Sequence, residues 1–225
     1  MAKEKNQKII LMKTGEATST IYVDLETFAG EKPGLDSITA DGRLKDPAKI
    51  AADIESKLDT TWRKQALSSI KGEIFCVGVA VDDEPGSVLY TGSEEATLKL
   101  FDTFLNKFSF PTLVAHRGMD FDFLFLFHKG LKYGLLNLIS LFDKGPQLKD
   151  TMKMLDGPSW KTMTSLDNMC QLLLGESAKG DITGKDVFDL ILNEEYDRIC
   201  EYCKTDVEWL RKCYNKLASY GLHTN

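Results

Sequence analysis

The sequence predicts a mixed α/β fold in which a central sheet comes mainly from the first half of the chain and helices dominate the second half. Strand-like alternation is concentrated before residue 117, helical spacing of apolar residues dominates after it, and no linker or low-complexity tract divides the chain. With 225 residues, 43% of them hydrophobic, the chain can bury one sizeable core. We therefore expect a single domain over residues 1–225, with residues 1–17 as a flexible or peripheral segment.

The first expected strand covers residues 19–28, where apolar residues alternate with a second set that includes Asp24 and Glu26. Glycines and prolines then predict a long loop over residues 29–47, and the sequence PAKIAADIESKL predicts a short helix over residues 47–58. Because the loop leaves directly from the two acids, we expect it to act as a lid or as a guide for a bound strand.

Three further strands are expected in the first half of the chain. Residues 72–83 and 86–92 flank the turn DDEPG and predict a hairpin. Residues 111–116, PTLVAH, predict a short buried strand. In the simplest arrangement the hairpin continues from the first strand, which gives a mixed central sheet with antiparallel first three strands, flanked by helices.

Helical spacing of apolar residues predicts the remaining elements, and serine or threonine caps indicate where two of these helices begin. The expected helices cover residues 93–108, 121–134, 165–175, 185–192 and 195–219. Two loops, residues 156–162 and 175–184, separate the later helices.

The charge and the cysteines exclude some classes of function. A formal net charge of -6 argues against a protein that coats long nucleic acids, but not against a nuclease whose acids bind divalent cations beside a phosphate. Five cysteines indicate reduced thiols, and Cys200 and Cys203 lack the second close pair of a zinc site, so we expect them to be ordinary helix residues. No segment has the pattern of a membrane span or a secretory signal, so we expect a cytoplasmic protein.

Asp24 and Glu26 are the first unusual feature, because side chains two apart on a strand lie about 6 to 7 Å from each other on one face. Two carboxylates at that separation repel unless a positive charge lies between them. The alternative is a solvated strand face, where acids are tolerated.

Two more acidic positions occur later in the chain. Asp122 interrupts the most apolar segment and needs a partner there, for which a cation shared with the first strand is suitable, whereas the preceding Asp120 is expected to cap a helix. Tyr202 and Asp206 are four residues apart and share one face of the last helix. Taken alone, this pair is equally consistent with an ordinary surface contact.

Together, three motifs resemble those of the DEDD superfamily of 3′-to-5′ exonucleases. They are VDLET, AHRGMDFD and YCKTD, at residues 23–27, 115–122 and 202–206. The tyrosine at 202 matches the tyrosine branch, since the histidine branch places its base where Glu201 stands. The segments DTMKML, TSLDNMCQLLLGESAKGDITG and ICEYCKTDVEWL are similar to stand-alone exonucleases related to the proofreading domain of family B DNA polymerases.

The resemblance implies a ribonuclease H-like fold and a catalytic set of four acids and a phenol with two divalent cations, Mg2+ or Mn2+. In that set Asp24 contacts both ions, Glu26 and Asp206 complete the site of the attacking water, and Asp122 holds the second ion. Tyr202 orients the water, because an unperturbed tyrosine pKa near 10 makes it a poor base at neutral pH.

Candidate substrate contacts are less specific. Aromatic side chains can stack on a terminal base and polar ones can meet a phosphate. The candidates are Thr27, Phe28, His116, Arg117, Phe121 and Trp160. Arg117 departs from the family, which has asparagine after the histidine, and is either a phosphate contact or a surface arginine. Trp160 has the alternative of packing against the core.

The leading hypothesis is an exonuclease that acts on the 3′ end of single-stranded DNA in replication, repair or recombination, with replication or recombination proteins as partners. An exoribonuclease or oligonucleotide-degrading enzyme has the same catalytic set and differs only in contacts to the 2′-hydroxyl. A non-catalytic module that binds nucleic acid or docks onto a polymerase predicts a missing acid, and all four are present.

Overall fold

The computed structural model describes residues 19–143, 145–157 and 163–222. Its centre is a five-stranded sheet in the order β3-β2-β1-β4-β5. β1 pairs antiparallel with β2, which pairs antiparallel with β3, whereas β4 runs parallel to both β1 and β5. The strands are β1 (Thr20–Ala29), β2 (Gly72–Val81), β3 (Ser87–Leu89), β4 (Thr112–Ala115) and β5 (Gln147–Asp150). The prediction of a mixed α/β fold with a sheet flanked by helices is confirmed.

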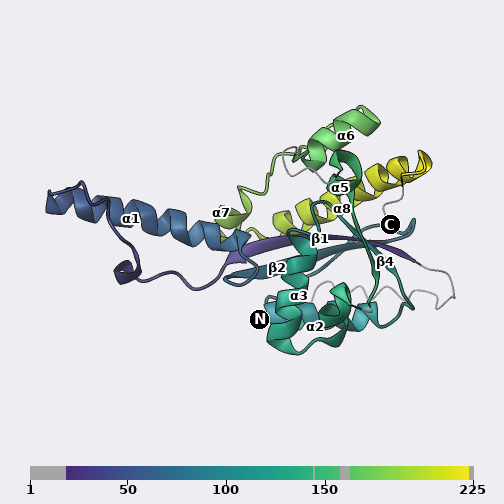
Figure 1. The fold of residues 1–225 in the computed structure, drawn as a ribbon, viewed down its shortest axis with the longest axis horizontal. Coiled ribbons are helices and arrows are strands. Elements are labelled where there is room, and N and C mark those ends of the chain that lie inside the picture. The colour runs from purple at the N-terminus through teal and green to yellow at the C-terminus, as the bar shows by residue number, and fades with distance from the viewer. Residues whose placement is uncertain (1–18, 144, 158–162, 223–225) are drawn as a thin grey trace.

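The helices lie on both faces of this sheet (Figure 1). The α-helices are α1 (Pro47–Lys64), α2 (Glu94–Leu105), α3 (Asp122–Tyr133), α4 (Leu136–Ile139), α5 (Thr151–Asp156), α6 (Leu166–Leu174), α7 (Val187–Leu192) and α8 (Tyr196–Ser219). Three short 3-10 turns are η1 (Leu35–Ser37), η2 (Gln65–Leu67) and η3 (Ser140–Phe142). None of the helices in the described part of the chain is both long and apolar enough to cross a membrane.

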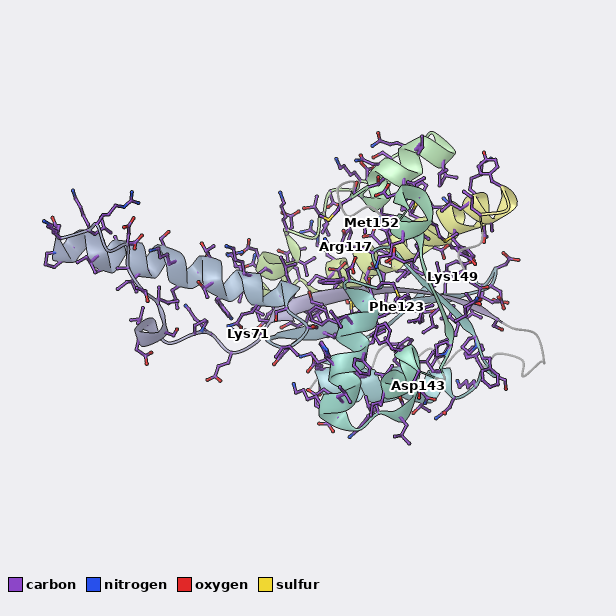
Figure 2. All side chains as sticks on the ribbon, in the orientation of Figure 1. Lys71, Arg117, Phe123, Asp143, Lys149 and Met152 are labelled. Carbon is purple, nitrogen blue, oxygen red and sulfur yellow. The ribbon has the colours of Figure 1, made fainter. Side chains whose placement is uncertain are left out.

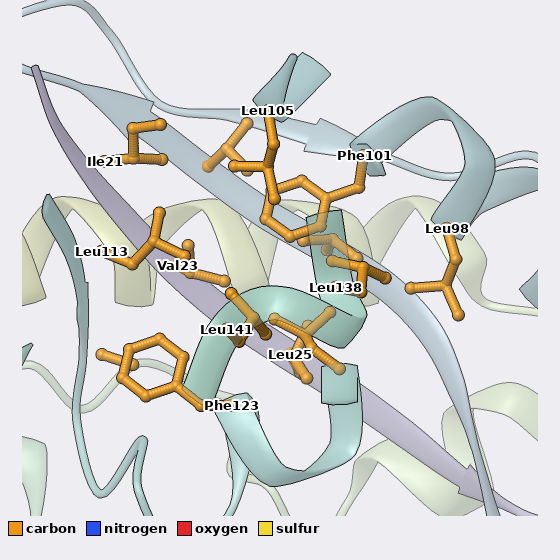
Figure 3. Close-up of a cluster of buried hydrophobic side chains, with 14 of the residues drawn as sticks. Ile21, Val23, Leu25, Leu98, Phe101, Leu105, Leu113, Phe123, Leu138 and Leu141 are labelled. Atoms are coloured by element: carbon orange, nitrogen blue, oxygen red, sulfur yellow. The ribbon is translucent and has the colours of Figure 1, made fainter. Parts of the chain in front are cut away.

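Alternation along β1 explains why helices cover both faces, since successive side chains point to opposite sides. Ile21, Val23 and Leu25 face a core shared with α2 and α3, as Figure 3 shows. Tyr22 points the other way and packs against Val207 of α8. The face of β1 that carries Tyr22 also carries Asp24 and Glu26, so α8 covers the strand face on which the acids lie.

Strands β1 and β4 are paired over only part of the length of β1. Parallel pairing with β4 involves only residues 20–22 of β1, whereas pairing with β2 continues to Ala29. From Val23 onward the β4 side of β1 therefore has no strand partner within the described chain. Asp24 lies on this unpaired stretch, where side chains from a neighbouring loop can approach the backbone.

An arm projects from the body between β1 and β2 (Figure 1). It contains η1, α1 and η2, and none of the residues of α1 is buried. The predicted helix over residues 47–58 extends to Lys64. Most of α1 points away from the sheet and does not cover the acids. The arm meets the body at the last turn of α1, where Trp62 packs against Phe28 and Phe188, and through η2.

Several expected boundaries differ from the structure by a few residues, and three elements were not predicted. The expected helix over residues 93–108 ends at Leu105, for example. The unpredicted elements are β5, α4 and α5. β5 has the polar sequence QLKD, and its strand conformation depends on pairing with β4 rather than on local propensity. The prediction for residues 1–17 lies outside the described residues.

Gly78 of β2 allows α8 to approach the sheet closely. It pairs with Asp24 across the strands, and a Cβ added there would lie 2.7 Å from Cγ2 of Val207 and 2.9 Å from Sγ of Cys203. Real Cβ atoms essentially never show contacts this short. The absence of a side chain at Gly78 therefore sets the distance between the acids on β1 and those on α8.

Replacing Gly78 with alanine is expected to push α8 away from the sheet and to lower the free energy of unfolding by about 1 to 3 kcal/mol. Urea unfolding monitored by circular dichroism measures this change. Gly42→Ala is the matched control, because no heavy atom lies within 4 Å of a Cβ there. Equal stability of the two variants would contradict the close packing described for α8.

Candidate active site

Glu26 and the half-buried Asp24 lie together on the α8 side of β1. Glu26 is only 8% exposed, and Oδ2 of Asp24 is buried without a hydrogen-bond partner among the described residues. Donor atoms of Asp24, Glu26 and Cys203 all lie within 4.8 Å of one another. A buried carboxylate oxygen without a partner is costly and unusual in proteins. This oxygen is therefore the clearest sign that the site is built for a ligand.

Cys203 lies at the centre of the contact between β1 and α8. Its fully buried thiol donates to the backbone oxygen of Asp24, with a distance of 3.6 Å between sulfur and oxygen. Sequence reasoning placed Cys203 correctly on a helix but missed its position beside the acids. The YCKTD motif contains the signal, because Cys203 immediately follows Tyr202.

Asp122 approaches β1 from the opposite edge. It is the first residue of α3, is 4% exposed, and accepts a hydrogen bond of 3.1 Å from the backbone N–H of Leu25 through Oδ1. This hydrogen bond can form because β1 has no strand partner on its β4 side at Leu25. Asp122 therefore has the partner that its apolar surroundings require, and that partner is the strand that carries the other acids.

The prediction that Asp120 caps a helix is wrong. Phe121 occupies the N-cap position of α3, and Asp120 is an exposed residue whose carboxylate lies 3.3 Å from Nζ of Lys153. The loop before α3 turns through Gly118, so the chain enters the helix one residue later than the sequence suggests.

Tyr202 and Asp206 are positioned by the apolar stripe of α8. Residues at helical spacing, among them Cys203, Val207 and Leu210, are buried against the sheet. Tyr202 and Asp206 lie beside this stripe, half-buried, on neighbouring turns. The charge of Asp206 raises the pKa of Asp24 and of Glu26, which places the last motif at the same site as the first.

Burial is the largest cause of an upward shift in the pKa values of all four acids. Burial raises the pKa of Asp122 to about 7 and that of Asp206 to about 6. Burial, followed by repulsion from neighbouring carboxylates, raises the pKa of both Asp24 and Glu26 well above their usual values. At neutral pH the cluster is therefore short of positive charge, and a divalent cation fits it.

The same cause keeps Tyr202 protonated. Burial, together with the charges of Asp206 and Glu26, raises the pKa of the Tyr202 phenol above its ordinary value. At neutral pH the phenol consequently donates a hydrogen bond and does not remove a proton.

An open pocket adjoins the acids on the unpaired side of β1. Its lining residues come from β1, from η2 and from the loop between β4 and α3: Asp24, Leu25, Leu67, His116, Arg117, Phe121 and Asp122. Leu67 is 72% exposed although it is apolar. Sequence reasoning missed Leu67, because a single leucine in a turn carries no signal and its place depends on how the arm returns.

Three of the predicted substrate residues, His116, Arg117 and Phe121, line this pocket. The Arg117 side chain is exposed near the start of α5, close to Met152 in Figure 2. His116 has contacts at both ring nitrogens, Nδ1 at 3.0 Å from Oγ1 of Thr151 and Nε2 at 2.8 Å from the backbone oxygen of Thr164. Burial lowers the pKa of His116, so its ring is neutral at physiological pH.

Of the other predicted substrate residues, neither Thr27 nor Phe28 lines the pocket. The Thr27 hydroxyl donates to the backbone oxygen of Ala66 at 2.7 Å. Phe28 packs against Phe188 and Trp62, with ring centroids 4.8 Å and 6.0 Å away. Trp160 lies outside the described residues. Substrate contacts of these three residues remain predictions.

The raised pKa values predict that the metal-free protein loses stability as the pH rises. The folded state retains protons on the acids that the unfolded chain has already lost, so the stabilisation is complete below the ordinary aspartate pKa of 3.8 and disappears as the pH passes about 6 to about 7. Urea unfolding in EDTA at about pH 5 and about pH 8 measures the difference.

Asp24→Asn is expected to raise the stability of the metal-free protein at the higher pH by about 1 to 3 kcal/mol and to flatten this pH dependence. Asp83→Asn, which removes the same charge from an exposed turn, is the control. Equal pH dependence in the wild-type protein and Asp24→Asn would show that Asp24 does not carry the repulsion.

Comparison with known proteins supports the interpretation of this fold. Among solved structures, the family B DNA polymerase from the hyperthermophilic archaeon Pyrobaculum calidifontis aligns with a TM-score of 0.62 and 13% sequence identity. The alignment covers 92% of this chain and 25% of the polymerase, so the chain spans about a quarter of that protein. At this identity the likeness concerns the fold alone. A search of curated proteins gave no match.

A family model matches residues 87–210, which include Asp122, Tyr202 and Asp206 but not the acids of β1. This match covers more than half of the 225 residues. The chain therefore belongs to the family described as predicted 3′-5′ exonucleases related to the exonuclease domain of PolB.

Proposed function

We propose that the protein is a metal-dependent 3′-to-5′ exonuclease of the tyrosine branch of the DEDD superfamily, with a ribonuclease H-like fold over residues 1–225. Its proposed substrate is the 3′ end of single-stranded DNA. The observation that carries the proposal is the buried, unpartnered Oδ2 of Asp24 within a cluster of acids from three separate elements. Family membership and the open pocket beside the cluster support the same conclusion.

Asp24, Glu26, Asp122 and Asp206 are the residues that would hold two divalent cations. Their carboxylate oxygens are hard donors of the kind that Mg2+ and Mn2+ prefer, and the raised pKa values of Asp24 and Glu26 support the proposal, because a bound cation offsets burial and repulsion there. When bound, the cations supply charge for the phosphate and lower the pKa of the attacking water. The Cys203 thiol is protonated and bonded to the β1 backbone, so it serves the structure of the site.

The other residues at the site bind and orient the substrate. The protonated Tyr202 phenol donates a hydrogen bond that fixes the position of the attacking water. The exposed Arg117 guanidinium lies at the pocket, where its forked donors match a phosphate. Leu67 and Phe121, which line the pocket, offer apolar surfaces for the terminal base.

Activity on RNA is the alternative within the same chemistry, because the acids act on the phosphodiester and only contacts to the 2′-hydroxyl separate the two substrates. A role as a non-catalytic binding module is less well supported, since it does not explain why the acid cluster is kept at a cost in stability. The proposed enzyme acts in the cytoplasm. Its substrates are the 3′ ends of DNA strands that arise in replication, repair or recombination.

Incubation of the purified protein with 5′-labelled and 3′-labelled oligonucleotides of DNA and RNA tests the proposal. With Mg2+ or Mn2+ we expect stepwise shortening from the 3′ end, which stops when EDTA is added. Asp24→Ala and Asp206→Ala are expected to lower the rate by at least about 1,000-fold, because each removes a cation ligand. Tyr202→Phe is expected to lower it by about 10- to 100-fold, because only the orientation of the water is lost.

Asp120→Asn is the matched control for these variants, since Asp120 is an exposed acid in the same loop and pairs with Lys153 on the surface. It should retain wild-type activity. Full activity of Asp24→Ala, or cleavage that persists in EDTA, would be incompatible with the proposed mechanism.

A further inference from the structure

The loop between β4 and α3 sets the position of Asp122 and Arg117 but has little regular structure of its own. Arg117 has a φ of 63°, in the left-handed region that residues with side chains rarely adopt. Phe121, at the N-cap of α3, makes no side-chain capping bond. The loop therefore needs an external contact to hold this conformation.

Asp150 supplies that contact. It is the last residue of β5, is only 4% exposed, and its carboxylate accepts backbone N–H groups from two different segments. Arg117 donates to Oδ1 at 3.1 Å and Met119 donates to Oδ2 at 3.1 Å. Met152 and Lys153, in the first turn of α5, donate to Oδ1 at 3.0 Å and 3.2 Å. The Asp150 carboxylate therefore links the loop to the first turn of α5 through hydrogen bonds.

Other contacts leave the loop little freedom. His116, just before it, is bonded to Thr151 next to Asp150. A Cβ on Gly118 would lie 2.6 Å from Cβ of Ala115 and 2.7 Å from the Phe123 ring, so this turn is closely packed. The loop ends at Asp122, whose Oδ1 accepts a hydrogen bond from the backbone N–H of Leu25 in β1. A shift of the loop would consequently move Asp122 relative to Asp24.

We infer that Asp150 is a positioning residue of the active site: it fixes the backbone of residues 116–121 and thereby the places of Asp122 in the acid cluster and of Arg117 at the pocket. The effect of Asp150 on catalysis rests on the proposed function. The inference goes beyond the acids and the phenol, because Asp150 lies on a different strand and does not line the pocket.

The simpler explanation is that Asp150 only caps α5. Asp150→Ser separates the two roles, because serine is an equally good N-cap but is too short to reach the loop as well. Asp102→Ser is the matched control. Asp102 of α2 also accepts two backbone N–H groups, from Asn137 at 3.0 Å and Leu138 at 3.2 Å, and it ties α2 to α4 on the opposite face of the sheet.

The experiment measures Mn2+ binding by electron paramagnetic resonance without substrate, then kcat and KM on a single-stranded oligonucleotide. Asp150→Ser is expected to weaken Mn2+ binding by about 10- to 100-fold, as for other residues that orient metal ligands. KM should rise as well, because Arg117 is released. Asp102→Ser should lose stability while keeping wild-type Mn2+ affinity, kcat and KM. Asp150→Asn, which retains one acceptor oxygen, should lie between Asp150→Ser and the wild-type protein.

Wild-type Mn2+ affinity and kinetics in a folded Asp150→Ser variant would overturn the inference, and so would an equal loss of Mn2+ affinity in Asp102→Ser. If Asp150→Ser does not fold, Asp150→Asn decides by the same measurements. If the wild-type protein cleaves no nucleic acid, the proposed function fails, whereas the Mn2+ affinities still decide whether Asp150 positions Asp122.

Discussion

The burial of several carboxylates close together is the constraint on which the rest of this structure depends. Burial raises the pKa values of Asp24, Glu26, Asp122 and Asp206, and repulsion from neighbouring carboxylates adds to the shift at Asp24 and Glu26. One oxygen of Asp24 has no partner among the described residues. A cluster of this kind does not form unless the surrounding structure holds it together. The apolar clusters on both faces of β1, with the close approach of α8 over Gly78, supply that restraint.

The site forms where parallel strands β1 and β4 diverge. Their pairing ends at Tyr22 and Val114, so β1 continues with a free edge and β4 leads into the loop that carries Arg117. This location follows a general rule for open α/β sheets, in which ligands bind beyond the carboxyl ends of the strands. The backbone N–H of Leu25, unpaired by the divergence, becomes the anchor for Asp122. The opening in the sheet therefore creates both the pocket and the contact that organises it.

The acids could be found from the sequence because each lies in a pattern with a local cause. Strand alternation places Asp24 and Glu26 on one face, and helical spacing places Tyr202 and Asp206 together. β5 could not be found in this way, since its polar residues form a strand only when paired with β4. The place of Leu67 depends on the path of the whole arm, and the mistaken role of Asp120 depends on where one irregular loop enters α3. Local patterns together with the resemblance to exonuclease motifs thus led to the proposed chemistry, whereas long-range contacts determine which residues line the pocket.

In the proposed function the acid cluster binds divalent cations, and in the metal-free protein it holds protons that exposed acids have lost. Calorimetric titration of the metal-free protein with Mn2+ at about pH 6.5, in two buffers that differ in ionisation enthalpy, measures the binding and the exchange of protons together. We expect saturable binding with release of protons, because the cation displaces those held at the raised pKa values of Asp122 and Asp206. Asp24→Asn should bind more weakly and release fewer protons. Absence of Mn2+ binding, or binding without proton release, would show that the cluster is not such a site.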